Sequence, residues 1–237
     1  MIKKKLGVIN VILLIGLIFI YVKGNYPAKI FKKLRTKKVR NISYSKKWRY
    51  RQEMSLYEYY NKTGNIVMLG NSITYRVNWN ELLNRTDIIN RGVGSDITEG
   101  MLNRLNYVLN ASPNLCFIMG GVNDITVGIH SDTIVFNLKK IADVLKQNEI
   151  KPIIFSILYV ADTYSNFYEF NKSIKQANTA IKKMCIDYKI EFIDLNLYLS
   201  DKEVLKSEYS FDGIHLTGPG YSKWRDVISP IIEREIE

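Results

Sequence analysis

Ser72, Asp212 and His215 are the residues of this chain whose types and spacing could perform chemistry. A serine hydroxyl is a weak nucleophile and needs a neighbouring base, for which an imidazole is the usual group. The chain contains only two histidines, His130 and His215, so the choice of base is narrow. Asp212 precedes His215 by three residues, so one tight loop can direct its carboxylate to the imidazole and stabilise the imidazolium. This pattern predicts acyl transfer through a serine nucleophile.

The oxyanion of such a reaction requires neutral hydrogen-bond donors that are held in place. Asn123, in the segment Gly120-Gly121-Val122-Asn123-Asp124, could supply a side-chain amide. Backbone N–H groups could supply further donors, for which a second polar segment is available, Asn90-Arg91-Gly92-Val93-Gly94-Ser95-Asp96. Both segments follow short apolar runs, so we expect them at the ends of strands.

Apolar runs and amphipathic segments alternate from residue 64 onward. The runs predict buried strands at 66–69, 87–90, 115–119, 152–158 and 190–195. Helices are predicted after a cap at Asp132, through 167–185, after a cap at Asp96, and after Gly218-Pro219-Gly220. Strands that alternate with helices imply a parallel sheet with right-handed crossovers. We therefore predict a three-layer α/β/α sandwich with a five-stranded parallel sheet of the flavodoxin-like type, with its site beyond the carboxyl ends of the strands.

Four separated motifs make residues 64–225 resemble the SGNH hydrolases, the GDSL-type esterase and lipase superfamily. The motifs stand in family order and are Gly70-Asn71-Ser72, Gly94-Ser95-Asp96, Gly121-Val122-Asn123-Asp124 and Asp212-Gly213-Ile214-His215. The resemblance implies that Ser72 is the nucleophile and that Asp212 and His215 complete a triad. It further implies an oxyanion hole formed by the backbone N–H groups of Ser72 and Ser95 and the Asn123 side chain, with Gly94 as an alternative to Ser95. No metal ion or organic cofactor is expected, because Asp212 and His215 alone are too few ligands for a catalytic zinc site.

Two positions depart from the family pattern. Asn71 stands where the family has an aspartate, which removes a carboxylate beside Ser72 but keeps a polar group of similar shape. Ser95 stands where the family has a glycine, and it still offers a backbone N–H. A serine there would be strained if the position requires a positive φ. Neither departure removes a member of the triad.

Each motif taken singly also has a purely structural interpretation. Ser72 could be a turn or cap residue, Asp212-Gly213 a turn, and Asn123-Asp124 a helix cap. Their combination in family order favours catalysis instead. An α/β-hydrolase would place a second glycine two residues after its nucleophile, where this chain has Thr74. His130 is expected on a surface loop.

The formal net charge of +11 is concentrated at the N-terminus of the 237-residue chain. The first 51 residues hold 15 of the 34 Lys and Arg residues and no Asp or Glu. The remaining 186 residues hold 19 basic and 23 acidic side chains, so the expected folded domain is mildly acidic. Nucleic-acid-binding domains carry their basic surface on the folded part, so we expect no nucleic-acid partner. The two cysteines provide neither a disulfide framework nor a structural zinc site.

Residues 6–22 follow three lysines, are uncharged and are apolar on every side. Their length is at the short end for a bilayer-spanning helix, and no small-residue cleavage site follows, so we predict a signal anchor over 1–23. We predict a basic linker over 24–60, ending in Tyr57, Tyr59 and Tyr60, and a hydrolase domain over 61–237. The lysines and arginines after the span favour a cytoplasmic domain by the positive-inside rule. An N-terminal anchor that begins with lysines commonly exports one C-terminal domain, so we expect a single-pass protein with an extracytoplasmic domain.

The sequence predicts an ester hydrolase and leaves its substrate open. SGNH relatives remove acetyl groups from polysaccharides, cleave lysophospholipids or thioesters, or transfer acyl groups between sugars. Because the site motifs contain no extended apolar stretch, we expect a short acyl group, acetyl, on a carbohydrate. The alternatives are a lysophospholipase-like lipid esterase and an O-acetyltransferase of an envelope polymer. A further hypothesis, from a different class, is a non-catalytic, membrane-anchored binding module that keeps the fold. Asn71 and Ser95 favour this hypothesis, whereas the intact triad residues argue against it.

Overall fold

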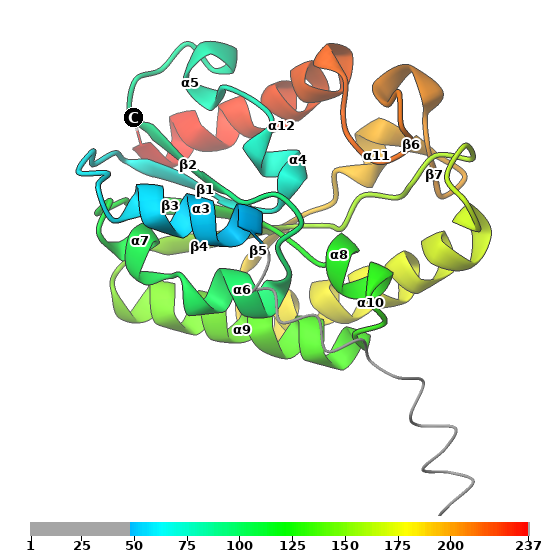
Figure 1. The fold of residues 1–237 in the computed structure, drawn as a ribbon, viewed down its shortest axis with the longest axis horizontal. Helices are drawn as coiled ribbons and strands as arrows, with labels where there is room; N and C mark the ends of the chain where they lie inside the picture. The colour runs from blue at the N-terminus through cyan, green and yellow to red at the C-terminus, as the bar shows by residue number, and fades with distance from the viewer. Residues whose placement is uncertain (1–47, 237) are drawn as a thin grey trace, which may run out of the picture. The chain divides into compact units, whose positions relative to one another are not determined.

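A computed structural model of the protein describes residues 48–236. Five parallel strands form one sheet in the order β2-β1-β3-β4-β5 (Figure 1). The strands are β1 (Ile66–Gly70), β2 (Ile88–Gly92), β3 (Leu115–Met119), β4 (Lys151–Phe155) and β5 (Glu191–Ile193). This is the flavodoxin-like order, in which the chain reverses direction across the sheet next to β1. The predicted α/β fold with five parallel strands is confirmed.

The central strands are buried on both faces, which explains their continuous apolar sequence. Every residue of β1 and β3 is buried, as expected where helices cover both sides of a parallel sheet. In the register of the sheet, Gly70 at the end of β1 pairs with Gly92 of β2 and Met119 of β3. The carboxyl ends of these three strands therefore meet at one edge, where the predicted site motifs begin.

Helices lie on both faces of the sheet (Figure 1). One layer contains α4 (Ser72–Tyr75), α5 (Trp79–Leu82), α11 (Asn196–Leu199) and α12 (Gly218–Ile236). The other contains α6 (Thr98–Asn103), α7 (Asn106–Leu109), α9 (Ser131–Gln147) and α10 (Phe167–Asp187). Shorter elements complete the domain: α8 (Val122–Thr126), the strand pair β6 (Ser200–Asp201) and β7 (Val204–Leu205), and a 3₁₀ turn at Ser207–Tyr209.

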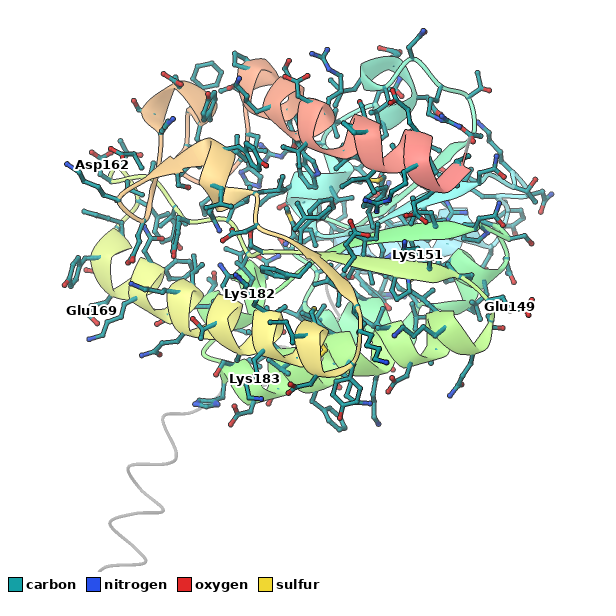
Figure 2. The ribbon with its side chains drawn as sticks, turned by 180° about the vertical axis from the view of Figure 1, so that it is seen from behind. Glu149, Lys151, Asp162, Glu169, Lys182 and Lys183 are labelled. Atoms are coloured by element: carbon teal, nitrogen blue, oxygen red, sulfur yellow. The ribbon has the colours of Figure 1, made fainter. Side chains whose placement is uncertain are left out.

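The long helices follow their predicted apolar stripes. In α9, Ile134, Leu138, Ile141 and Leu145 are all buried. The predicted cap at Asp132 is wrong, because the His130 ring accepts the hydrogen bond from the Asp132 N–H and is the N-cap. Asp132 lies in the first turn, where its negative charge interacts favourably with the positive end of the helix dipole. On α10, Glu169, Lys182 and Lys183 are exposed, so the surface of this helix carries both signs of charge (Figure 2).

An aromatic cluster attaches α12 to the rest of the domain. The Trp224 ring packs against Trp79 and Phe155, with ring centroids 4.9 and 5.1 Å apart. Tyr221 donates a hydrogen bond of 2.6 Å from its hydroxyl to the carbonyl of Ile73 in α4. Because Ser72 begins α4 and His215 precedes α12, this contact connects the two segments that carry the site.

The predicted linker over 24–60 contains a helix near its end, α3 (Trp48–Tyr57). Tyr50 and Tyr57 of this helix are buried, and the Tyr57 hydroxyl donates to the carbonyl of Gly92 at 3.0 Å. The guanidinium of Arg91 lies 4.6 Å from the centre of the Tyr57 ring. The last part of the predicted linker is therefore packed on the domain, because two tyrosines provide both apolar area and hydrogen bonds.

Among residues 48–236, no helix combines the length and the apolar character that a membrane crossing requires. The predicted anchor at 6–22 and the first part of the predicted linker lie outside the described residues.

Glu149 ends α9 in the left-handed conformation, with φ of +61°. The following Ile150 N–H bonds back to the carbonyl of Leu145, as in a Schellman motif, where glycine is preferred. We expect Glu149→Gly to raise the free energy of unfolding by about 1 kcal/mol, because it removes the steric cost of this conformation. Urea denaturation measures this change. Glu149→Ala is the control, since alanine keeps the left-handed cost, and equal stabilisation by both variants would contradict the explanation.

Candidate active site

Ser72, His215 and Asp212, the three residues of the predicted triad, lie in one hydrogen-bonded row. The Ser72 Oγ is 2.9 Å from Nε2 of His215, and Nδ1 of His215 is 2.6 Å from Oδ2 of Asp212. Ser72 is the first residue of α4, directly beyond β1. Asn71 caps this helix through its Oδ1, which accepts a hydrogen bond of 2.9 Å from the Ile73 N–H. The row has the geometry of a nucleophile, a base and an orienting acid.

The Asp212 carboxylate is held in place by its own loop. Its Oδ1 accepts hydrogen bonds from the backbone N–H groups of Ile214 and His215, at 3.0 and 2.8 Å. Partial burial raises the pKa of Asp212, but these bonds and the bond with the His215 ring outweigh it and bring the pKa well below its usual range. Asp212 therefore stays ionised at neutral pH and favours the imidazole tautomer that presents Nε2 as an acceptor to Ser72.

Two glycines allow the backbone to turn sharply beside the row. A Cβ on Gly70 would lie 2.0 Å from Oγ1 of Thr74 and 2.8 Å from the carbonyl oxygen of Met119. Gly121 has φ of +125°, and a Cβ there would lie 2.4 Å from Cδ1 of Ile157. Only glycine fits at these positions. They set the entries to α4 and α8, and so place Ser72 and Asn123.

A cavity of about 400 Å³ brings the predicted site residues together. Its lining includes Ser72, His215, Gly94, Ser95 and Asn123, whereas Asp212 lies outside the lining, behind His215. Asn123 donates from Nδ2 to the carbonyl of Asp96 at 2.8 Å, which holds the amide beside the loop that carries Ser95. The predicted oxyanion donors thus share one cavity with the predicted nucleophile.

The sequence model of the GDSL-like Lipase/Acylhydrolase family matches residues 68–223, which contain the hydrogen-bonded row and the predicted oxyanion donors. The chain belongs to this family. Residues 68–223 therefore form a domain of the GDSL-like lipase/acylhydrolase type, and the resemblance to the SGNH hydrolases is confirmed.

Solved structures of GDSL-type proteins share the fold. A GDSL-like lipase from Bacteroides thetaiotaomicron is 25% identical, with 78% of this chain and 97% of that chain covered and a TM-score of 0.69. A candidate acylhydrolase from Bacteroides fragilis is 26% identical, with 81% and 100% covered and a TM-score of 0.71.

The curated relatives are longer proteins. The N-acylneuraminate cytidylyltransferase of Streptococcus agalactiae is 26% identical over 160 residues, or 67% of this chain. The chain spans 36% of the length of that relative. The activity in its name belongs to the whole protein and does not bear on this site.

The two departures from the GDSL-type pattern are accommodated differently. Asn71 is buried and satisfied as a helix cap, so its amide replaces the family's carboxylate without a structural defect. Ser95 has φ of +62°, in the left-handed region where a glycine would carry no steric cost. The condition under which a serine was expected to be strained here, a positive φ, is therefore met.

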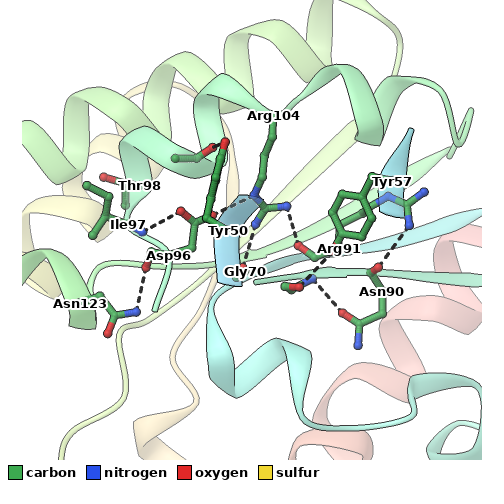
Figure 3. A network of polar contacts seen from close by, with 12 residues as sticks. Tyr50, Tyr57, Gly70, Asn90, Arg91, Asp96, Ile97, Thr98, Arg104 and Asn123 are labelled. Carbon is green, nitrogen blue, oxygen red and sulfur yellow. Dashed lines mark hydrogen bonds and ion pairs between the residues drawn. The ribbon is translucent and has the colours of Figure 1, made fainter. Parts of the chain in front are cut away.

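A buried ion pair behind the site is a feature that sequence reasoning missed. Arg104 and Asp96 are both fully buried, with Nε of Arg104 2.8 Å from Oδ2 of Asp96 (Figure 3). Arg104 also donates to the carbonyls of Arg91 and Gly70, at 2.8 and 2.9 Å. It therefore joins the ends of β1 and β2 to the loop of Ser95.

The predicted role of Asp96 as a helix cap is wrong. Ile97 is the N-cap residue of α6, and it makes no side-chain capping bond. The Asp96 carboxylate turns to Arg104, because a buried arginine requires a charged partner. No sequence signal identified this pair, since the partners of Arg104 are one carboxylate and two backbone carbonyls from separate segments.

Asn123→Ala is expected to lower kcat for ester hydrolysis by about 10²–10³-fold, the usual effect of removing one oxyanion-hole donor. Ser95→Ala is the matched control, since the donor expected there is a backbone N–H that alanine retains. Steady-state kinetics with p-nitrophenyl acetate, on variants with unchanged circular dichroism, compares the two. Equal losses in both variants would contradict a side-chain donor at position 123.

Proposed function

We propose that this GDSL-type hydrolase removes short acyl groups, acetyl in particular, from carbohydrate through an acyl-serine intermediate. The observation that carries the proposal is the row from Ser72 through His215 to Asp212, with contacts of 2.9 and 2.6 Å. A serine hydroxyl, an imidazole and an ionised carboxylate in this order can generate an alkoxide-like nucleophile at neutral pH.

In the acylation step, Ser72 Oγ attacks the ester carbonyl while its proton passes to Nε2 of His215. The carbonyl oxygen becomes an oxyanion, which the backbone N–H groups of Ser72 and Ser95 and the Asn123 amide stabilise. The carbon–oxygen bond to the alcohol then breaks, and His215 gives its proton to the departing oxygen. Asp212 stabilises the imidazolium between the two proton transfers.

In the deacylation step, water takes the place of the alcohol. His215 removes a proton from the water, whose oxygen attacks the acyl carbon of the acyl-serine. The bond to Ser72 Oγ breaks, and His215 returns the proton to that oxygen. The products are the free acid and the regenerated enzyme.

The cavity supports a short acyl group and a polar alcohol. Most of its lining side chains are polar or charged, and the aliphatic ones are Val122 and Ile214. Such a lining matches a sugar better than a long acyl chain, which needs an extended apolar groove. A protein of the same fold, 19% identical, is described as an acetyl xylan esterase, so the fold is compatible with acetylated carbohydrate.

The test is hydrolysis of p-nitrophenyl esters from acetyl to decanoyl by the full-length chain in mild detergent. A fluorophosphonate probe and the Ser72→Ala protein are included as controls. We expect Ser72-dependent turnover that is fastest with acetyl. A preference for decanoyl would indicate a lipid esterase, and transfer of acetyl to an added sugar instead of water would indicate a transferase. If the folded protein neither hydrolyses the esters nor reacts with the probe, the result would favour the non-catalytic binding module.

We also propose that residues 6–22 anchor the protein in a membrane with the hydrolase domain outside the cytoplasm. The support is the uncharged apolar run and the absence of a cleavage site after it. Fractionation followed by protease treatment of intact cells tests this. Digestion of the domain in intact cells is expected, and protection until the membrane is opened would place the domain in the cytoplasm.

A further inference from the structure

Helix α3 contributes one wall of the site cavity. Trp48, Arg49, Gln52 and Glu53 from this helix line the cavity together with Tyr75 and Arg76. Buried Tyr50 and Tyr57 attach an adjacent side of the same helix to the domain. The wall is therefore fixed in place, and its side chains meet any substrate that reaches Ser72.

Arg49 lies against the loop that carries the predicted oxyanion donor Ser95. A Cβ placed on Gly94 would be 3.6 Å from Cδ of Arg49 and 3.9 Å from its Nη1. The Arg49 guanidinium is also 5.3 Å from the centre of the Trp48 ring. The side chain of Arg49 thus lines the cavity next to the loop that carries Ser95.

Arg76 supplies a second positive charge to the same cavity. It is the C-cap residue of α4, the single helical turn that begins at Ser72. Arg76 and Arg49 are both exposed. Within residues 48–236, neither guanidinium forms a salt bridge with an acidic side chain.

Glu53 is the one acidic side chain among the described residues that line the cavity. The negative charge of the Glu53 carboxylate is the largest cause that raises the pKa of the Tyr75 hydroxyl, which lines the same cavity. Two arginines against one glutamate give the lining a positive balance, although residues 48–236 as a whole, with 21 basic and 22 acidic side chains, are close to neutral. Clustered charge of one sign in a cleft concentrates ligands of the opposite sign.

We propose that this cavity selects esters whose alcohol portion carries an anionic group, a carboxylate or a phosphate, and that Arg49 and Arg76 bind that group. A guanidinium presents paired N–H donors that match the oxygen spacing of both anions. The proposal rests on the proposed esterase function and names the substrate class of the same site.

The test compares two acetyl esters of similar shape, 4-acetoxybenzoate, which is anionic, and methyl 4-acetoxybenzoate, which is neutral. The measured quantity is the ratio of kcat/KM for the anionic ester to kcat/KM for the neutral ester. We expect Arg49→Gln and Arg76→Gln each to lower this ratio about tenfold, the scale of one charge-assisted hydrogen bond. Added salt is expected to lower the wild-type ratio as well, because the arginines are exposed.

Arg51→Gln is the matched control, since Arg51 belongs to α3 and is exposed but does not line the cavity. The control is expected to keep the wild-type ratio. An equal loss for both esters in Arg49→Gln and Arg76→Gln would overturn the selection of anions, and Ser72-dependent turnover would still support the esterase. A ratio that falls as far in Arg51→Gln would equally overturn it, since the effect would then be one of net charge.

A binding measurement tests the anion site without turnover. Calorimetric titration of the full-length Ser72→Ala chain with 4-hydroxybenzoate and with 4-hydroxyphenyl phosphate gives two dissociation constants and ranks carboxylate against phosphate. Weaker binding of the preferred anion after Arg49→Gln supports the inference, even if no ester is hydrolysed and the esterase proposal fails. No binding of either anion, or binding unchanged by both substitutions, would overturn it.

Discussion

Ser72→Ala is expected to lower kcat for acetyl ester hydrolysis by about 10⁶-fold, the loss typical of removing the nucleophile of a serine triad. The variant keeps the cavity and the oxyanion donors, so a small residual acceleration over water is expected. His215→Ala is expected to cost about as much, because Ser72 Oγ and His215 Nε2, 2.9 Å apart, act as one unit. The double variant should then be no slower than either single one. Rates with p-nitrophenyl acetate measure these effects.

His130→Ala is the matched control for the loss of an imidazole. His130 is the other histidine of the chain, it is exposed, and it caps α9 outside the site cavity. We expect its kcat to equal that of the wild type. Substantial turnover by Ser72→Ala, or additive losses when Ser72 and His215 are both replaced, would contradict the assigned roles.

The strands, and the meeting of the candidate site residues in one place, were predictable because their signals are local. A buried parallel strand needs a continuous apolar run, and β3 (Leu115–Met119) has the predicted bounds. The polar motifs follow such runs, and the parallel topology brings the ends of β1, β2 and β3 together. The three-residue spacing of Asp212 and His215 likewise restricts their contact to a single loop.

The features that were missed depend on contacts between distant segments. Helix α3 has no apolar stripe, and its attachment depends on Tyr50 and Tyr57, whose hydroxyls donate to carbonyls of Gly100 and Gly92. A basic segment with two such tyrosines cannot be distinguished from a linker until those partners are in place. The burial of Arg104 was harder still to predict, because nothing around it in the sequence indicates a buried side chain.

Arg104→Met is expected to lower the free energy of unfolding by about 3–5 kcal/mol, because it leaves the Asp96 carboxylate buried without its charged partner. Typical domains are stable by about 5–15 kcal/mol, so this change removes a large share. The carbonyls of Gly70 and Arg91 lose a donor at the same time. Urea denaturation measures the change. A loss of kcat is also expected, since Gly70 lies two residues before Ser72 and Asp96 follows Ser95.

Two further variants separate the buried pair from a general effect of losing an arginine. Arg85→Met removes an arginine that pairs with Asp87 near the surface, with side chains 20% and 23% exposed, so we expect a change of about 1 kcal/mol or less. Adding Asp96→Asn to Arg104→Met is expected to restore part of the lost stability, because the unpaired charge is then gone. Arg104→Met could prove as mild as Arg85→Met, or the double variant could lose as much stability as Arg104→Met and Asp96→Asn lose together. Either result would show that the buried pair does not hold the Ser95 loop to β1 and β2.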